Sequence, residues 1–186
     1  MGPYLGQPNV EKESEVGENS TVRYGATSMQ GWRKSQEDSH IAATDVAENV
    51  SVFGVFDGHG GKEVSIYVKK HLVNELKSLA SFKSGNYESA LREVFKRMDD
   101  LLLTTTGEQE LKKIREAYGG DSMHGLGLTD PSAPISKFTG CTATVVLISK
   151  DTIYCANAGD SRTVLARSSK TNSIEALSED HKPDNF

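Results

Sequence analysis

Hydrophobic and polar positions along the chain follow two periods, one typical of strands and one typical of helices. Runs of β-branched and aromatic residues, separated by turn-forming residues, predict strands at 22–30, 40–46 and 50–56. The last run, Val50-Ser-Val-Phe-Gly-Val-Phe56, is mostly apolar on both faces, which is typical of a central, buried strand. We therefore expect a sheet whose middle strand ends at Phe56.

Helical spacing of apolar residues begins after this strand. Such residues recur over 64–79 and again over 87–102, where Asn86 is in position to cap the second helix. Thr106 and Gln109 have the spacing of a capping box and predict a third, shorter helix.

The second half of the chain returns to strand-like patterns after an irregular stretch. Residues 119–138 are rich in Gly, Ser and Pro without periodicity, and they predict a long loop. Short β-rich runs at 141–148, 152–157 and 163–167 then predict an antiparallel meander. This order of strands, helices and strands predicts an α+β fold in which a mainly antiparallel sheet system is covered by helices. A doubly wound parallel sheet is the alternative.

Length and composition fit a globular domain. The 186 residues suit one domain or a large piece of one. Residues 1–20 are polar, with two prolines, and predict a flexible N-terminal arm before a folded part at 21–186. With 36% apolar and 25% charged residues, the chain is neither disordered nor membrane-spanning in composition. Cys141 and Cys155 lie in apolar, strand-like runs, so we expect buried free thiols rather than disulfides or nucleophiles.

Charge and hydropathy exclude several classes of partner. Acidic residues outnumber basic ones by 26 to 21, and no segment concentrates Lys and Arg, which argues against nucleic-acid binding. We find neither a bilayer-spanning apolar stretch nor the hydrophobic region of a signal peptide, so a cytoplasmic or nuclear location is expected. N-myristoylation of Gly2 would give a weak membrane link. The motif is imperfect, because Gly6 stands where Ser or Thr is expected and Pro3 directly after Gly2 disfavours the modification.

The sequence Asp57-Gly58-His59-Gly60-Gly61 places a carboxylate and an imidazole at the end of the predicted central strand. Glycines let the backbone approach a ligand closely and offer carbonyl oxygens to hard cations, and Asp57 can bridge two such cations. The alternative is an Asp-Gly turn with a solvated histidine. A phosphate-binding P-loop is excluded, because Lys62 is followed by Glu63 and the required upstream glycine is absent.

A second polar cluster lies between the first two predicted strands. Arg33 can hold a phosphate dianion with its two-pronged guanidinium. The adjacent acids Glu37 and Asp38 can point to opposite sides of an extended backbone, one toward a metal and one toward its surroundings. A solvated acidic pair is the alternative for these two residues.

Six segments in order along the chain together resemble the metal-dependent serine/threonine protein phosphatases of the type 2C family. They are Arg23-Tyr24-Gly25, Ser28-Met29-Gln30-Gly31-Trp32-Arg33 through Glu37-Asp38, Val55-Phe56-Asp57-Gly58-His59-Gly60-Gly61, Thr139-Gly140-Cys141-Thr142-Ala143, Asn157-Ala158-Gly159-Asp160-Ser161-Arg162 and Asp180-His181-Lys182-Pro183. The resemblance implies an antiparallel β-sandwich flanked by helices, here C-terminally incomplete. It also implies that the turn at 160–162 is structural.

The resemblance further implies hydrolysis of phosphoserine and phosphothreonine in protein substrates at two Mg²⁺ or Mn²⁺ ions. Carried over, Asp57 would bridge the ions and the carbonyl of Gly58 would ligate one of them. Glu37 and Asp38 would act mainly through water on the ions and through hydrogen bonds around them. Arg33 would bind the substrate phosphate, and His59 would protonate the departing alkoxide.

General chemistry agrees with these roles. Two ions roughly 3.5–4 Å apart lower the pKa of a water between them and neutralise the transferring phosphoryl group. A general acid contributes about 10²–10⁴ in rate, which matters for a serine alkoxide because it is a poor leaving group. Oxygen ligands also favour Mg²⁺ or Mn²⁺ over Zn²⁺.

The chain departs from the family pattern in two places. Two later aspartates complete the metal site of the family beyond the Asp180-His181-Lys182-Pro183 segment, so we expect this chain alone to be inactive or nearly so. Residues 136–138 are Ser-Lys-Phe where some members carry an aspartate tied to a third metal. The alternatives are a noncatalytic, phosphatase-like binding module and an unrelated Mg²⁺- or phosphate-binding regulator.

Overall fold

A four-stranded antiparallel sheet forms the centre of the molecule in the computed structural model, which describes residues 4–118, 133–168 and 173–184. Its strands, in spatial order, are β3 (Ser39–Ala47), β4 (Val50–Phe56), β7 (Ala143–Ser149) and β8 (Thr152–Ala158). Every strand pair between the described residues is antiparallel, which confirms the predicted α+β class against the doubly wound alternative.

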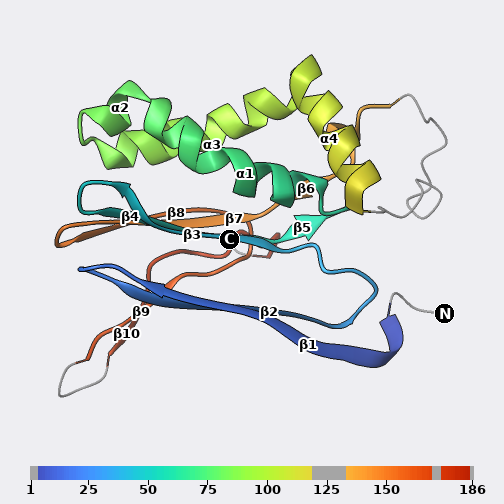
Figure 1. Cartoon of the computed structure of the whole chain (residues 1–186), viewed down its shortest axis with the longest axis horizontal. Helices are drawn as coiled ribbons and strands as arrows, with labels where there is room; N and C mark the ends of the chain where they lie inside the picture. Colours follow the sequence, from blue (N-terminus) through green and yellow to red (C-terminus); the bar gives the residue numbers. More distant parts are fainter. Residues whose placement is uncertain (1–3, 119–132, 169–172, 185–186) are drawn as a thin grey trace.

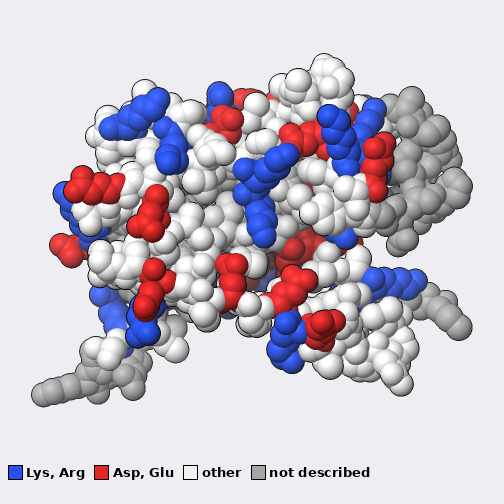
Figure 2. All heavy atoms as spheres, in the orientation of Figure 1, with Lys and Arg blue, Asp and Glu red and all other residues white. Residues whose placement is uncertain are grey.

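Helices cover one face of this sheet, and a hairpin lies on the other side (Figure 1). The helices are α1 (Glu63–Ser78), α2 (Ala80–Lys83), α3 (Tyr87–Leu102) and α4 (Thr105–Tyr118). The hairpin consists of β1 (Tyr4–Glu18) and β2 (Arg23–Arg33). None of the helices in the described parts of the chain is long and apolar enough to cross a bilayer. Over the face shown in Figure 2, Lys and Arg are interspersed with Asp and Glu, so neither sign dominates it.

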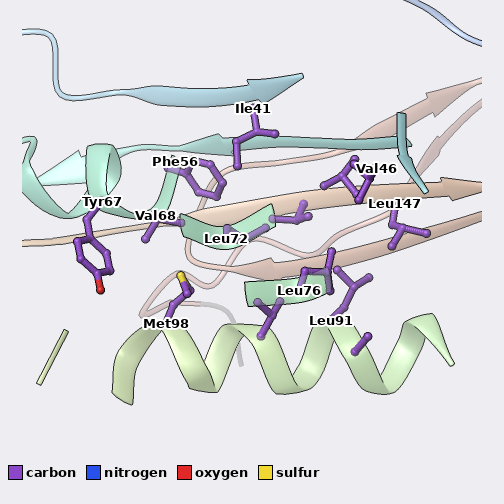
Figure 3. Packing of buried hydrophobic residues seen from close by; sticks show 14 of the residues in the cluster. Ile41, Val46, Phe56, Tyr67, Val68, Leu72, Leu76, Leu91, Met98 and Leu147 are labelled. Carbon is purple, nitrogen blue, oxygen red and sulfur yellow. The ribbon is translucent and has the colours of Figure 1, made fainter. Parts of the chain in front are cut away.

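The predicted central strand is β4. It pairs with β3 on one side and with β7 on the other, and most of its side chains are buried. The apolar stripes of α1 and α3 pack against this sheet, with Val68, Leu72 and Leu76 facing Leu91 in the same cluster (Figure 3). Burial of apolar surface between the helical layer and the sheet is therefore what fixes the position of the segment that follows Phe56.

Helix capping follows the prediction at one helix and differs at another. The side chain of Asn86 accepts a hydrogen bond from Ser89 N at 3.2 Å, as predicted for the cap of α3. The capping-box prediction at Thr106 is wrong, because α4 already begins at Thr105. Thr104 Oγ1 accepts from Gly107 N at 3.0 Å instead, and a Cβ on Gly107 would overlap the carbonyl oxygen of Leu101.

The expected flexible N-terminal arm at 1–20 needs correction. Residues Tyr4–Glu18 are extended, but they form β1 and pair with β2 from Tyr4 opposite Arg33 to Glu18 opposite Arg23. The cause is backbone pairing rather than burial, since nearly all side chains of β1 are exposed. Asn19 stabilises the connecting turn, because its side-chain oxygen accepts from Val22 N at 3.0 Å.

The predicted three-strand meander is only partly correct. β7 and β8 form the expected hairpin, but β9 (Val164–Ala166) leaves this sheet and pairs with β10 (Ile174–Ala176). Of the predicted loop at 119–138, residues 119–132 lie outside the described residues, and Ile135–Lys137 form a short 3₁₀ helix.

The two cysteines have the predicted free thiols. Both are half-buried rather than fully buried. Burial raises the pKa of the Cys141 thiol to about 12, so this group stays protonated and is a poor nucleophile at neutral pH.

A buried ion pair joins the first and last helices of the helical layer. Glu63 begins α1, and its side chain is 3% exposed; Arg115 Nε of α4 donates to Glu63 Oε1 at 2.6 Å. Among the described residues, Glu63 Oε2 has no hydrogen-bond partner, so Arg115 is the group that compensates this buried charge.

We expect Arg115→Met to lower the free energy of unfolding by about 3 kcal/mol, since it leaves the Glu63 carboxylate buried without its cation. Urea unfolding monitored by circular dichroism measures this change. The control is Arg92→Met, which breaks the exposed Glu88–Arg92 pair within α3 and should cost less than about 0.5 kcal/mol. Equal losses for the two variants would contradict the role of burial.

Candidate metal centre

The backbone of Asp57 is fixed at the point where β4 ends. Its N–H donates to Thr142 Oγ1 at 3.2 Å, and its carbonyl oxygen accepts from Thr142 N at 2.8 Å. The next two residues form the short strand β5 (Gly58–His59), which pairs with β6 (Gly140–Cys141). The side chain of Asp57 is exposed, so the fold holds the backbone of this residue and leaves its carboxylate available to a ligand.

Two glycines allow three segments to meet at this end of the sheet. A Cβ on the buried Gly58 would lie 2.6 Å from the carbonyl oxygen of Glu37. Gly60 has a φ of +70°, and a Cβ there would overlap the carbonyl oxygen of Phe138. Both positions therefore require glycine, and the close approach brings Glu37 beside the segment that follows Asp57.

Protein donors engage both the side chain and the backbone of Glu37. Ser35 Oγ donates to Oε1 at 2.7 Å and Gly61 N donates to Oε2 at 3.3 Å. The buried hydroxyl of Ser65, in the first turn of α1, donates to the Glu37 carbonyl at 2.6 Å. These contacts fix both the carboxylate and the backbone of Glu37 beside the segment that follows Asp57.

Asp38 and Asp57 lie near each other, because Ser39, next to Asp38, pairs with Phe56, next to Asp57. Partial burial raises the pKa of Asp38, and the charge of Asp57 and the hydrogen bond between the two carboxyls raise it further. Arg33 acts in the opposite direction, which places its positive charge close to the pair. A divalent cation beside Asp38 would favour its ionised form and offset the repulsion from Asp57.

The donor set fits a hard cation. Its side chains offer oxygen atoms only, and the carbonyl of Gly58 adds a neutral oxygen, which suits Mg²⁺ or Mn²⁺. Within the described ranges, no group of three or more His, Cys, Asp or Glu side chains is arranged as metal ligands. The acidic residues that the structure brings to this end of the sheet are Asp38, Asp57 and Glu37, and the Glu37 carboxylate accepts from Gly61 N.

The other two predicted site residues flank this centre. Arg33 is exposed at the end of β2, and its charge acts on Asp38. His59 is exposed on β5, and its ring lies over Gly140, where a Cβ would be 2.5 Å from the ring Nε2. The glycine at 140 therefore allows the imidazole to approach the backbone of β6 closely.

Sequence reasoning missed the hydroxyl groups that hold the centre. Thr142 and Ser65 each bond the backbone of a site residue, Asp57 and Glu37 respectively. Thr142 lies within a segment that carries the family resemblance, and this was the available signal for it. Ser65 has no such signal, because a serine in the first turn of a helix is common for reasons of capping.

Comparison with known proteins identifies the class to which this fold and centre belong. The family model "Protein phosphatase 2C" matches residues 22–186. The chain belongs to the protein phosphatase 2C family.

Similar proteins include "Protein phosphatase 2C 1" of Paramecium tetraurelia, 48% identical over 185 residues, which cover 100% of this chain and 56% of that protein. "Probable protein phosphatase 2C 21" of Arabidopsis thaliana is 41% identical, over 99% of this chain and 57% of that protein. The chain thus spans about half the length of the curated relatives it matches.

Solved structures share the fold. The serine-threonine phosphatase 2C from Toxoplasma gondii superposes with a TM-score of 0.55 at 19% identity, covering 97% of this chain and 54% of that one. A sex-determining protein of C. elegans superposes with a TM-score of 0.54 at 22% identity, covering 95% of this chain and 36% of that one. At these identities the likeness concerns the fold, and it agrees with the predicted phosphatase 2C-like α+β architecture.

Proposed function

We propose that this chain is part of a metal-dependent protein phosphatase that hydrolyses phosphoserine and phosphothreonine in protein substrates. The observation that carries the proposal is the close packing of the Glu37 carbonyl against Gly58, which brings the acids at 37 and 38 to the segment of Asp57, in a chain of the protein phosphatase 2C family. The positive charge of Arg33 acts on Asp38, and its guanidinium can bind a phosphate.

Asp57 and the Gly58 carbonyl would hold Mg²⁺ or Mn²⁺, with Asp38 and Glu37 acting through water on the ions. Bound there, the ions supply an activated water and neutralise charge on the phosphoryl group. Arg33 would bind the substrate phosphate with two parallel hydrogen bonds and orient it for in-line attack. His59 would donate a proton to the departing serine or threonine oxygen.

The 186-residue chain alone is proposed to turn over little or no substrate. One directly ligating carboxylate and one carbonyl would bind Mg²⁺ weakly, because this cation gives up its hydration shell reluctantly. A phosphatase-like binding module is the second candidate, since the same fold can recognise a phosphoprotein without hydrolysing it. The presence of His59 together with Arg33 and Asp57 argues for catalysis, since a binding module has no need of a proton donor.

Removal and return of the metal test the proposal. We expect the product of the complete reading frame to hydrolyse a phosphothreonine peptide with Mn²⁺, to stop after EDTA and dialysis, and to recover with Mn²⁺ but not with Zn²⁺. Released phosphate is the measured quantity. Phosphopeptide binding without hydrolysis would favour the binding module instead.

The 186-residue chain is assayed in parallel under the same conditions. Turnover by the pure chain at a rate similar to that of the complete protein would refute the proposal that it is inactive alone. Isothermal titration with Mn²⁺ should show weaker binding to this chain than to the complete protein, because fewer carboxylates surround the cation.

A further inference from the structure

Two hydroxyl pairs join β7 and the residue before it to the segment that follows β8. Thr142 Oγ1 and Ser161 Oγ lie 2.7 Å apart, and Thr144 Oγ1 and Thr163 Oγ1 also lie 2.7 Å apart. Both pairs link residues 19 positions apart in the sequence. Residues 161–163 therefore run alongside the start of β7, with one hydroxyl bond for every second residue.

Only the first pair reaches the metal centre. Thr142 Oγ1 also accepts from Asp57 N, and Thr142 N donates to the Asp57 carbonyl, so Thr142 contacts both backbone polar groups of that residue. Thr144 lies opposite Val55 on β4, two residues farther from the centre. The two hydroxyl pairs thus have the same length, but only the Thr142–Ser161 pair includes a residue that contacts Asp57.

A strap formed by residues 178–182 holds the segment that carries Ser161. Arg162 Nε and Nη2 donate to the two carboxylate oxygens of Asp180, both at 2.8 Å. His181 N donates to the Gly159 carbonyl at 2.9 Å, and Gly159 N donates to His181 Nδ1 at 3.3 Å. The turn at 160–162 is therefore fixed from outside by this strap.

The turn that the strap holds packs closely against Thr142. Gly159 has a φ of +109°, and a Cβ there would lie 2.6 Å from Thr142 Cγ2. A side chain at this position would push the turn away and separate Ser161 from Thr142. Glycine at 159 therefore allows both this backbone conformation and the close approach to Thr142.

We propose that Thr142 and Ser161 are positioning residues that fix the backbone of Asp57 and thereby the affinity of the metal centre. The inference rests on the proposed function for its effect on metal binding, while the fixing of Asp57 stands on the contacts of Thr142. A carboxylate that ligates a metal must be held in place by its neighbours, and losing such a neighbour weakens metal binding by about 10–100-fold.

The test compares Thr142→Val with Thr144→Val in the complete protein. Each variant keeps a β-branched side chain and loses one hydroxyl–hydroxyl bond of the same length, and Thr142→Val also loses the acceptor of Asp57 N. For Thr142→Val we expect Mn²⁺ binding about 10–100-fold weaker by isothermal titration. Exchange of the Asp57 amide hydrogen should be roughly fivefold to tenfold faster, because its acceptor is gone. Thr144→Val should change neither quantity, and Thr142→Ser should restore both.

The two readouts separate the possible failures. Equal effects of Thr142→Val and Thr144→Val on exchange and on Mn²⁺ binding would reduce Thr142 to a structural residue and overturn the inference. Unchanged exchange at Asp57 in Thr142→Val would overturn it as well. If the unmodified complete protein binds no Mn²⁺ while Asp57 exchange responds to Thr142→Val alone, the proposed function fails and the positioning of Asp57 is upheld.

Discussion

Asp57→Asn in the complete protein is expected to remove Mn²⁺-dependent hydrolysis of a phosphothreonine peptide, with a loss well beyond the roughly 10²-fold that removing a neighbour of a metal ligand costs. Asparagine has nearly the same shape, so the hydrogen bonds of the backbone to Thr142 can remain. It carries no charge, however, and its NH₂ group would face one of the cations that the carboxylate would bridge. Released phosphate measures the rate.

The stability of this variant separates loss of metal from loss of fold. Asp57 is one of the groups that raise the pKa of Asp38, so the two carboxylates repel each other when both are ionised. The metal-free Asp57→Asn protein should therefore be at least as stable as the unmodified one at neutral pH. Asp151→Asn, at the exposed turn at the far end of the sheet, is the control and should keep its activity. Retention of more than a tenth of the rate by Asp57→Asn would contradict the assignment.

The parts of the fold that could be predicted from sequence are those whose burial leaves a pattern. β4 is buried on one face and partly covered on the other, its sequence is mostly apolar on both, and α1 carries one buried stripe at helical spacing. β1 shows no such pattern because its side chains are mostly exposed and only its backbone is engaged. β9 and β10 likewise have exposed residues, so their pairing with each other rather than with β8 could not be read from alternation.

The same distinction applies to the centre. Asp57, Glu37 and Asp38 could be proposed because their chemistry and their place after or before strands are visible in the sequence. The proximity of Asp38 to Asp57 depends on the antiparallel pairing of β3 with β4, which puts Ser39 opposite Phe56. The bond from Asp57 to Thr142 spans 85 residues and depends on β7 joining the sheet beside β4. Such contacts follow from the register of the strands, which local patterns do not determine.

His59→Gln is expected to slow hydrolysis in proportion to how much the leaving group needs a proton. A serine or threonine alkoxide is strongly basic, so a phosphothreonine peptide should be hydrolysed about 10²–10⁴-fold more slowly without the general acid. The p-nitrophenolate ion is a weak base that departs without protonation. Its phosphate ester should therefore be hydrolysed at a rate much closer to that of the unmodified protein.

The comparison of two substrates distinguishes proton donation by His59 from a structural role of its ring, which lies over Gly140. Misplacement of the ring or of β5 would disturb the metal centre and slow both substrates alike. His71→Gln provides the control, because His71 contacts Glu110 and the ring of Tyr67 within the helical layer, and both rates should stay near those of the unmodified protein. A loss of the same size on both esters in His59→Gln would rule out the general-acid role, since only a group that protonates the leaving oxygen separates them.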